Sequence, residues 1–99
     1  MITKKFSPKG KSVRVTFELP AGIATDSVAV VGDFNEWNLE KDKMKFDTKK
    51  GVWTKAISLQ PDNSYEFRYF VDGGKWANDE EADGYQPTPF FSENCVLEV

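Results

Sequence analysis

Residues 65–76 read YEFRYFVDGGKW and contain the pattern that decides the fold. Large apolar side chains stand at every second position of 65–71, with Arg68 among the residues between them. Successive side chains of a strand point to opposite faces of a sheet, so this period of two predicts a half-buried strand with Arg68 directed away from the core. Asp-Gly-Gly follows at 72–74 and is one of the strongest sequence signals for a hairpin turn. The stretch therefore predicts two antiparallel strands that meet at this turn.

Other short strands are predicted along the rest of the chain. Alternating apolar and polar residues predict half-buried strands at 12–19 and 52–59, and an apolar run predicts a central strand at 27–32. CVLEV at 95–99 predicts a last short strand. Turns rich in Gly, Pro and Asn separate these segments, and no ten residues keep a helical period. The sequence therefore predicts an all-β protein with an antiparallel β-sandwich fold.

The strand pattern also predicts which residues form the core. Lys55 interrupts the alternation of its strand, which indicates a sheet edge at that position, and Cys95 is expected to be a small core residue. Gly32 is expected to let the backbone turn after an apolar strand, and Phe34 to lie in the core, so neither is predicted to bind a ligand. The predicted core residues are Val13, Val15, Phe17, Val30, Trp53, Ile57, Phe67, Tyr69 and Leu97.

Length and composition limit the possible functions. Residues 1–99 suffice for one domain with a single core. Thirteen basic and sixteen acidic residues give a net charge of −3. The five basic residues within 4–14 are expected to lie on a solvated strand and turn. No apolar run approaches the ~20 residues needed to span a bilayer, no signal peptide is recognisable, and the single Cys95 fits a reducing compartment. We therefore expect a cytoplasmic protein that binds neither nucleic acid nor membranes.

Residue patterns typical of catalysis are absent from the sequence. The chain has no His, which removes the usual general base and the commonest metal ligand. Gly73-Gly74 lacks the Lys-Ser/Thr of a phosphate-binding loop, and the acidic residues at 79–83 lack EF-hand spacing, so we expect those acids to face water. Sixteen acidic residues leave a glycosidase-type carboxylate pair open, but a sandwich of this size has little room for a sugar cleft. The sequence favours a protein that is not an enzyme and needs no cofactor or metal.

Two tryptophans stand at polar turns rather than in strand centres. Trp37 lies in GDFNEWN at 32–38, and Trp76 follows the hairpin turn. Such a ring either folds back to cover an end of the sandwich or forms a flat stacking surface. The apolar face of a pyranose stacks on an aromatic ring, while its hydroxyls need amide, carboxylate or guanidinium partners. The two rings form one sugar site only if the fold brings their turns together.

These segments closely resemble the family 48 carbohydrate-binding modules. The resemblance covers residues 13–99 and rests on VVGDFNEWN, GVWTKAISL, YEFRYFVDGGKW and NCVLEV, in the same order. Members of this family are the glycogen- and starch-binding domains of AMP-activated protein kinase β subunits, and others precede the catalytic domains of branching enzymes and isoamylases. The resemblance implies an immunoglobulin-like β-sandwich, in agreement with the strand pattern.

The resemblance also implies which residues bind sugar. Trp37 and Trp76 match two tryptophans that stack on successive glucose rings. Arg68 matches a basic residue that hydrogen-bonds sugar hydroxyls, although kinase β subunits have Lys there, and Asn94 matches an asparagine with the same role. By strand parity, Arg68 and Asn94 both lie opposite core-facing neighbours and are free to point outward.

The segment 80–93 matches the family least. Family members use a loop there to clasp the glucan through an aliphatic residue and a Thr. Phe90 and Ser92 fall near that loop and are the weaker site candidates, because the alignment of this segment is loose.

Two classes of function follow from these observations. The first is a non-catalytic module that binds α-1,4-glucans such as glycogen, starch or maltooligosaccharides. The second is a regulatory subunit or adaptor that binds a protein partner, such as a glycogen- or starch-metabolising enzyme or a kinase. The presence of both Trp37 and Trp76 favours sugar, and the lack of a catalytic domain leaves a protein partner open. A small hydrolase would need an acid pair in one cleft and ranks third.

Overall fold

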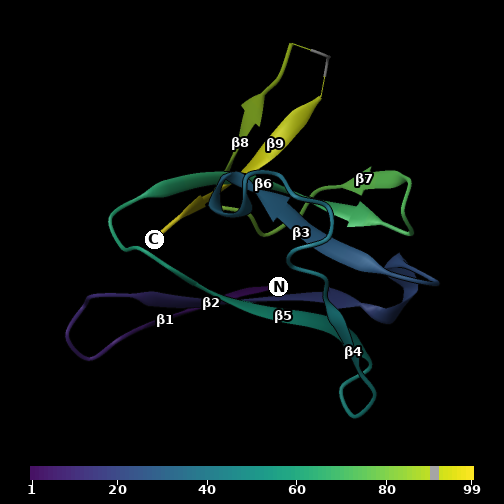
Figure 1. Ribbon diagram of the computed structural model, residues 1–99, viewed down its shortest axis with the longest axis horizontal. Coiled ribbons are helices and arrows are strands. Elements are labelled where there is room, and N and C mark those ends of the chain that lie inside the picture. Colours follow the sequence, from purple (N-terminus) through teal and green to yellow (C-terminus); the bar gives the residue numbers. More distant parts are fainter. Residues whose placement is uncertain (90–91) are drawn as a thin grey trace.

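The computed structural model shows two antiparallel sheets that pack face to face as an immunoglobulin-like β-sandwich (Figure 1). It describes residues 1–89 and 92–99. The first sheet contains β1 (Ile2–Phe6), β2 (Val13–Pro20), β5 (Val52–Leu59) and β4 (Lys45–Asp47), in that order. The second has the order β3 (Val28–Gly32), β6 (Ser64–Val71), β9 (Glu93–Glu98) and β8 (Gly84–Pro87), with β7 (Lys75–Ala77) also paired to β6. The predicted all-β sandwich is confirmed.

The strands that the sequence did not predict all lie at the ends of the sheets. These are β1, β4 and β8, which are three to five residues long and have largely exposed side chains. The described helices are two 3-10 turns of three residues each, η1 (Ala21–Ile23) and η2 (Asp33–Asn35). Within the described chain, therefore, no helix is long and apolar enough to cross a membrane. The sequences of these short polar edge strands show no alternation of apolar and polar residues, because neither face of such a strand is fully buried.

The position of β3 differs from the prediction. All of its residues are buried, but β3 lies at the end of the second sheet and pairs with β6 alone, so the expectation of a central strand is wrong. A chain segment covers its other edge: the Val30 N–H donates to the Asp42 carbonyl at 3.0 Å, and the Met44 N–H donates to the Val28 carbonyl at 2.7 Å. Residues 42–44 thus replace the missing neighbour strand and account for the apolar character of β3.

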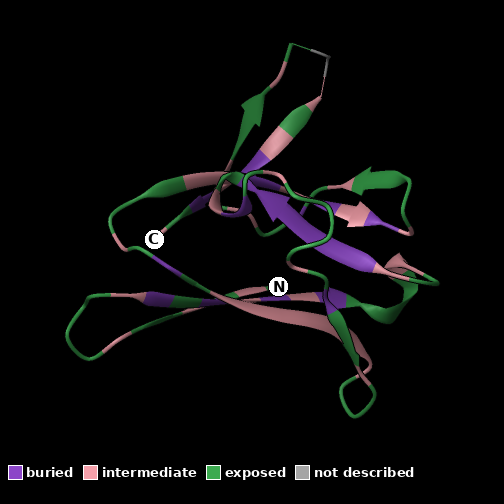
Figure 2. Ribbon diagram, viewed as in Figure 1, coloured by how far each residue is buried: buried purple, intermediate pink, exposed green. Residues whose placement is uncertain are grey.

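Most of the predicted core is fully buried between the sheets, but Trp53 and Ile57 are not. Seven of the nine predicted residues have no exposed surface: Val13, Val15, Phe17, Val30, Phe67, Tyr69 and Leu97. Trp53 and Ile57 pack against this core and are only half-buried, as is most of β5 in Figure 2. For Ile57 the physical reason is that β4 pairs only with residues 52–54 of β5, so the rest of that strand has an open edge. Trp53 does have a partner on β4, but this partner, Phe46, is itself 42% exposed. Lys55 follows directly after the paired residues, as its break in the alternation predicted, and its ammonium lies 3.9 Å from the Asp42 carboxylate.

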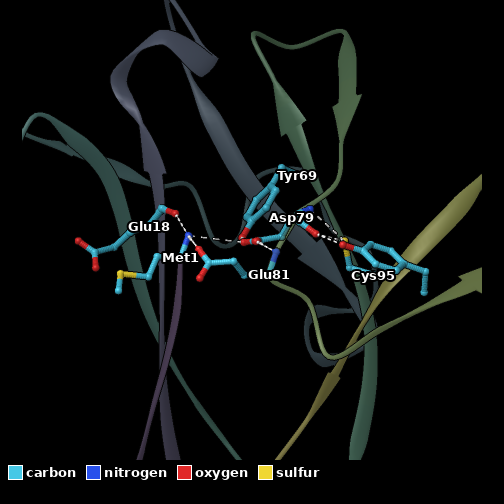
Figure 3. Close-up of polar contacts among 7 residues, drawn as sticks. Met1, Glu18, Tyr69, Asp79, Glu81 and Cys95 are labelled. Atoms are coloured by element: carbon cyan, nitrogen blue, oxygen red, sulfur yellow. Dashed lines mark hydrogen bonds and ion pairs between the residues drawn. The ribbon is translucent and has the colours of Figure 1, made fainter.

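Asp79 is buried, which corrects the expectation that the acidic residues at 79–83 face water. Its side chain is 3% exposed, and Figure 3 shows it inside a polar cluster at one end of the core. The Tyr69 hydroxyl donates to the Asp79 carboxylate at 2.6 Å, and the Tyr85 hydroxyl donates to the Asp79 carbonyl at 2.6 Å. Burial, and next the bond to Asp79, raise the pKa of Tyr69 far above its usual range, so this hydroxyl stays protonated as a donor. The cluster fixes the chain shortly after β7.

Asp72 ties the β6–β7 hairpin to the loop before β3. It has a left-handed backbone conformation, with φ of 50°, and its carboxylate accepts hydrogen bonds from the backbone N–H groups of residues 25–27 at 2.7 to 3.2 Å. These donors, that of Asp26 foremost, lower the pKa of Asp72 from 3.8 to about 2. The hairpin that carries Trp76 is thereby anchored at its turn.

This contact predicts a loss of stability in acid. Because the pKa of Asp72 is lower in the folded chain than in the unfolded chain, its contribution is complete above the ordinary value of 3.8 and disappears as the pH falls toward about 2. Asp72→Asn is therefore expected to be less stable than the wild type at pH 6, with a difference that shrinks between pH 4 and 2. Urea unfolding at these pH values measures it, with Asp62→Asn, at another left-handed turn position, as the control. A difference that stays constant with pH would contradict the contact.

Candidate functional site

The four residues with the strongest predicted site roles meet on the outer face of the second sheet. Arg68 projects from β6, Trp76 from β7 and Asn94 from β9, while Trp37 lies two residues after η2. Together they line one hollow of about 380 Å³. We call this hollow the aromatic hollow; its lining residues are Trp37, Arg68, Trp76, Thr88, Pro89 and Asn94. Segments far apart in the sequence are therefore brought into one site, as the sugar hypothesis requires.

Trp76 is held by two outward-facing neighbours on β6. It stands directly opposite Phe70 in the strand pairing, and the two ring centroids are 4.8 Å apart. The guanidinium carbon of Arg68 lies 5.6 Å from the centroid of the Trp76 ring, within the range of a cation–π interaction. Even so, 45% of Trp76 remains exposed. In the described part of the chain the Arg68 Nε–H has no hydrogen-bond partner, so an unpaired donor stands beside the ring.

Trp37 owes its position at a polar turn to an unusual backbone. Glu36 and Trp37 have φ angles of 58° and 56°, two successive left-handed residues that reverse the chain after η2. The Trp37 backbone N–H donates to the Gly32 carbonyl at 3.0 Å, and its indole Nε1–H donates to Asp33 Oδ1 at 3.0 Å. The ring is half-buried and held at both its backbone and its indole nitrogen.

Asp33 is a positioning residue that the sequence analysis missed. While its Oδ1 accepts the indole N–H of Trp37, its Oδ2 accepts the backbone N–H of Glu66 on β6 at 2.8 Å. One carboxylate thus connects the Trp37 ring to the strand that carries Arg68. The available signal was a short acidic side chain directly after a buried strand and four residues before the tryptophan.

The remaining residues of the GDFN segment support this corner from inside. Asn35 is 2% exposed; its Oδ1 accepts the Gly32 N–H at 3.0 Å, and its Nδ2 donates to the Val30 carbonyl at 2.9 Å. Phe34, predicted to lie in the core, packs against it with its ring 6.2 Å from that of Phe17 but is only half-buried. The segment therefore shapes the turn, and only Trp37 of this turn lines the aromatic hollow.

Gly32 is required for a reason other than the predicted one. Its φ of −170° is extended backbone that any residue adopts, so the turn itself does not need glycine. A Cβ at this position would lie 2.5 Å from the Glu66 carbonyl oxygen and 2.7 Å from the Phe67 Cβ. The absence of a side chain lets β3 and η2 approach β6 closely.

The loop side of the hollow matches the sequence prediction only in part. The Asn94 Nδ2 donates to Glu66 Oε1 at 3.2 Å, which orients the amide at the edge of the hollow. Thr88 and Pro89 line the hollow without having been predicted, whereas Ser92 contacts it through Thr88, since the two hydroxyls share a hydrogen bond of 2.8 Å. Phe90 lies outside the described residues. The loose family match of 80–93 explains why sequence alone did not identify Thr88 and Pro89.

Asp33→Asn is expected to weaken ligand binding in the aromatic hollow. The Trp37 indole N–H and the Glu66 N–H bond to different oxygens of Asp33, so in the Asn variant the amide N–H₂ group would face one of these donors. Losing such a charge-assisted bond costs about 1–2 kcal/mol, or roughly 5- to 30-fold in affinity if the ring loses its orientation. Oligosaccharide titration monitored by tryptophan fluorescence measures the loss. The exposed neighbour variant Glu36→Gln should bind normally, and wild-type affinity in Asp33→Asn would show that the ring needs no such support.

The fold and the hollow together define a class: a small β-sandwich binding module with an aromatic surface site. Among the described residues no group of three or more His, Cys, Asp or Glu could hold a metal ion. Residues 5–86 match the family described as Carbohydrate-binding module 48 (Isoamylase N-terminal domain), and the chain belongs to this family of non-catalytic carbohydrate-binding modules.

A curated relative agrees with this assignment. The chain is 32% identical over 82 residues to the 1,4-alpha-glucan branching enzyme GlgB of Aquifex aeolicus (strain VF5). The match covers 81% of this chain and 12% of the enzyme, so the chain spans only a small part of the length of that relative. The similarity supports the family assignment, but it does not assign the activity of the whole enzyme to this chain.

Proposed function

We propose that this carbohydrate-binding module binds α-1,4-glucans, such as glycogen, starch or maltooligosaccharides, through a stacking platform of Trp37 and Trp76. The observation that carries the proposal is the aromatic hollow, which contains both indoles together with Arg68 and Asn94. The name of the branching enzyme, which refers to 1,4-alpha-glucan, supports the choice of sugar. Indole rings offer apolar surface to the CH faces of glucose, and the guanidinium and amide groups offer partners for its hydroxyls.

The proposed module acts without catalysis. None of the described residues that line the aromatic hollow is a carboxylate, a cysteine or a histidine, so the hollow offers no acid–base pair for hydrolysis. The proposal includes a cytoplasmic location, supported by the single cysteine, Cys95, whose thiol is buried and free.

Calorimetric titration with maltoheptaose tests this function. We expect a dissociation constant of roughly 10 μM to 1 mM, because a platform of two rings and a few hydrogen bonds provides about −7 to −4 kcal/mol. The affinity should change little with salt, since the ligand is neutral. Cellohexaose should bind at least about tenfold more weakly, because its flat β-1,4 ribbon does not follow the curve that an α-1,4 chain offers to two separate rings. Absence of binding to both millimolar maltoheptaose and glycogen would overturn the proposal.

A further inference from the structure

A second hollow lies on the sheet that does not carry the aromatic hollow. Its volume is about 410 Å³. Arg14 and Thr16 alternate with buried residues of β2, so their side chains lie on the outer face of the first sheet. In the sandwich, this face is turned away from the second sheet (Figure 1). The residues that line this hollow are Arg14, Thr16, Lys43, Lys45, Thr54, Lys55 and Ala56.

Four of these seven lining residues are cations, and none is acidic. We call Arg14, Lys43, Lys45 and Lys55 the basic face. The strand pairing places Arg14 and Lys45 on the outer face of the sheet, whereas Lys55 stands opposite the core-facing Phe17 and Lys43 belongs to the segment beside β3. The basic face belongs to a chain with sixteen acidic and thirteen basic residues, so positive charge is concentrated here against the overall sign. The other lining residues are Thr and Ala, which are small and leave the cations accessible between them.

Nearby carboxylates compensate only part of this charge. Asp42 lies 3.9 Å from the Lys55 ammonium, and Glu40 lies 2.7 Å from that of Lys43. Glu18 also faces outward, opposite Thr54 in the strand pairing. Arg14 and Lys45 form no ion pair in the described part of the chain.

The strand register adds a further cation beside Arg14. Lys5 of β1 stands directly opposite Arg14, so both side chains emerge on the same face, and Lys5 also has no ion pair among the described residues. Arg14 on β2 stands opposite Ser58 of β5, and Lys45 on β4 stands opposite Thr54 of β5. Their backbones are therefore roughly 10 Å apart across the strands and roughly 13 Å apart along them. The uncompensated charges, which lie on β1, β2 and β4, are therefore spread across the width of the four-stranded sheet rather than gathered around one point.

We propose that the basic face is a docking surface for an acidic protein surface. Charges spread across the sheet fit several carboxylates of a partner better than one phosphate, because Arg14 and Lys45 stand two strands and four residues apart in the strand pairing. Nucleic acid fits less well, because strong binding needs many phosphate contacts and only three cations here lack a partner. The two hollows lie on different sheets, so partner and glucan can be bound at the same time. The module would then hold an acidic partner beside a glucan.

The test uses an acidic peptide of twelve residues that alternates Glu and Ser, titrated into the ¹⁵N-labelled protein at 20 mM NaCl. We expect the largest amide shifts at Thr16, Lys45 and Thr54, and a drop in affinity of about tenfold between 20 and 200 mM NaCl as the charges are screened. Arg14→Glu/Lys45→Glu should weaken peptide binding by about tenfold or more. The matched control Lys9→Glu/Lys11→Glu makes the same change of charge in the 7–12 turn and should weaken it less than about threefold.

Three further measurements decide between this docking surface and other interpretations. Maltoheptaose affinity should be unchanged in Arg14→Glu/Lys45→Glu, which separates the proposal from the sugar function, and Arg14→Gln/Lys45→Gln repeats the test if the charge reversal unfolds the protein. Inorganic phosphate that shifts the same amides at the same concentration would overturn the proposal in favour of a small-anion site. Tighter binding of a single-stranded oligonucleotide than of the peptide would overturn it in favour of nucleic acid. Peptide shifts spread equally over Lys9 and Lys11 would overturn it as non-specific attraction.

Discussion

Replacing Trp76 with alanine is expected to lower the affinity for maltoheptaose by about 30-fold or more, a loss of at least about 2 kcal/mol. The ring is 45% exposed, and its described ring contacts are with Phe70 and Arg68 on the outer face, away from the core. The free energy of unfolding should therefore change by less than about 1 kcal/mol. Calorimetry with maltoheptaose and urea unfolding measure the two effects separately.

Trp37→Ala should reduce affinity equally and also cost some stability. Its indole donates to Asp33, and the loss of this bond is expected to lower the free energy of unfolding by about 1 kcal/mol. Phe6→Ala is the matched control, because Phe6 is an exposed aromatic residue of β1 that does not line the aromatic hollow. Wild-type affinity in both tryptophan variants would show that the platform does not bind the sugar.

Gly32→Ala is expected to destabilise the fold more than any other single substitution considered above. The new Cβ would lie 2.5 Å from the Glu66 carbonyl oxygen and 2.7 Å from the Phe67 Cβ, and both neighbours belong to the central strand β6. Neither atom can yield without moving that strand, so we expect a loss of about 3 kcal/mol or more. For a chain of 99 residues this corresponds to a fall in Tm of roughly 12 °C or more.

The matched control for this substitution is Gly22→Ala. An added Cβ at Gly22 would meet nothing within 4 Å, so differential scanning calorimetry should give a Tm close to that of the wild type. Gly32→Ala should also weaken maltoheptaose binding, because Asp33 and Trp37 follow the displaced glycine. A thermally stable Gly32→Ala protein would contradict the close contact of β3 with β6.

The alternation of apolar residues was sufficient to predict the sandwich and most of its core. It succeeds where one face of a strand is fully buried, as for Phe67 and Tyr69 on β6. It fails where burial depends on a partner that lies elsewhere in the sequence. Ile57 has the same pattern as buried residues, yet it is half-buried because β4 pairs only with residues 52–54 of β5. Trp53 is half-buried beside its partner Phe46, an exposed residue of β4.

The site could be predicted in those parts where the family motif fixes both residue and strand. Parity placed Arg68 and Asn94 on the outer face, and the motif supplied Trp37 and Trp76; the structure brings all four together. Their roles in binding sugar stay predictions. What the sequence could not show are contacts across segments, such as the bond from Glu66 to Asp33 over 33 residues.

The loop residues of the aromatic hollow and the buried acidic residue Asp79 could not be predicted from the sequence either. Thr88 and Pro89 reach the hollow through the path of a loop that has no periodic pattern. In the sequence, Asp79 looks like one of several acidic surface residues. Only the structure shows that Tyr69 and Tyr85 both donate hydrogen bonds to it. Composition predicts the average behaviour of acidic residues and misses the buried exception.

The most direct measurement is the NMR spectrum of the indole Nε1–H groups during a maltoheptaose titration. The chain contains three tryptophans, so each gives one assignable signal. Trp37 and Trp76 line the aromatic hollow, whereas Trp53 belongs to β5 in the other sheet and serves as an internal reference. We expect the Trp37 and Trp76 signals to move together with one dissociation constant while the Trp53 signal stays in place. No shift at millimolar maltoheptaose, or a shift of Trp53 alone, would contradict sugar binding at this platform.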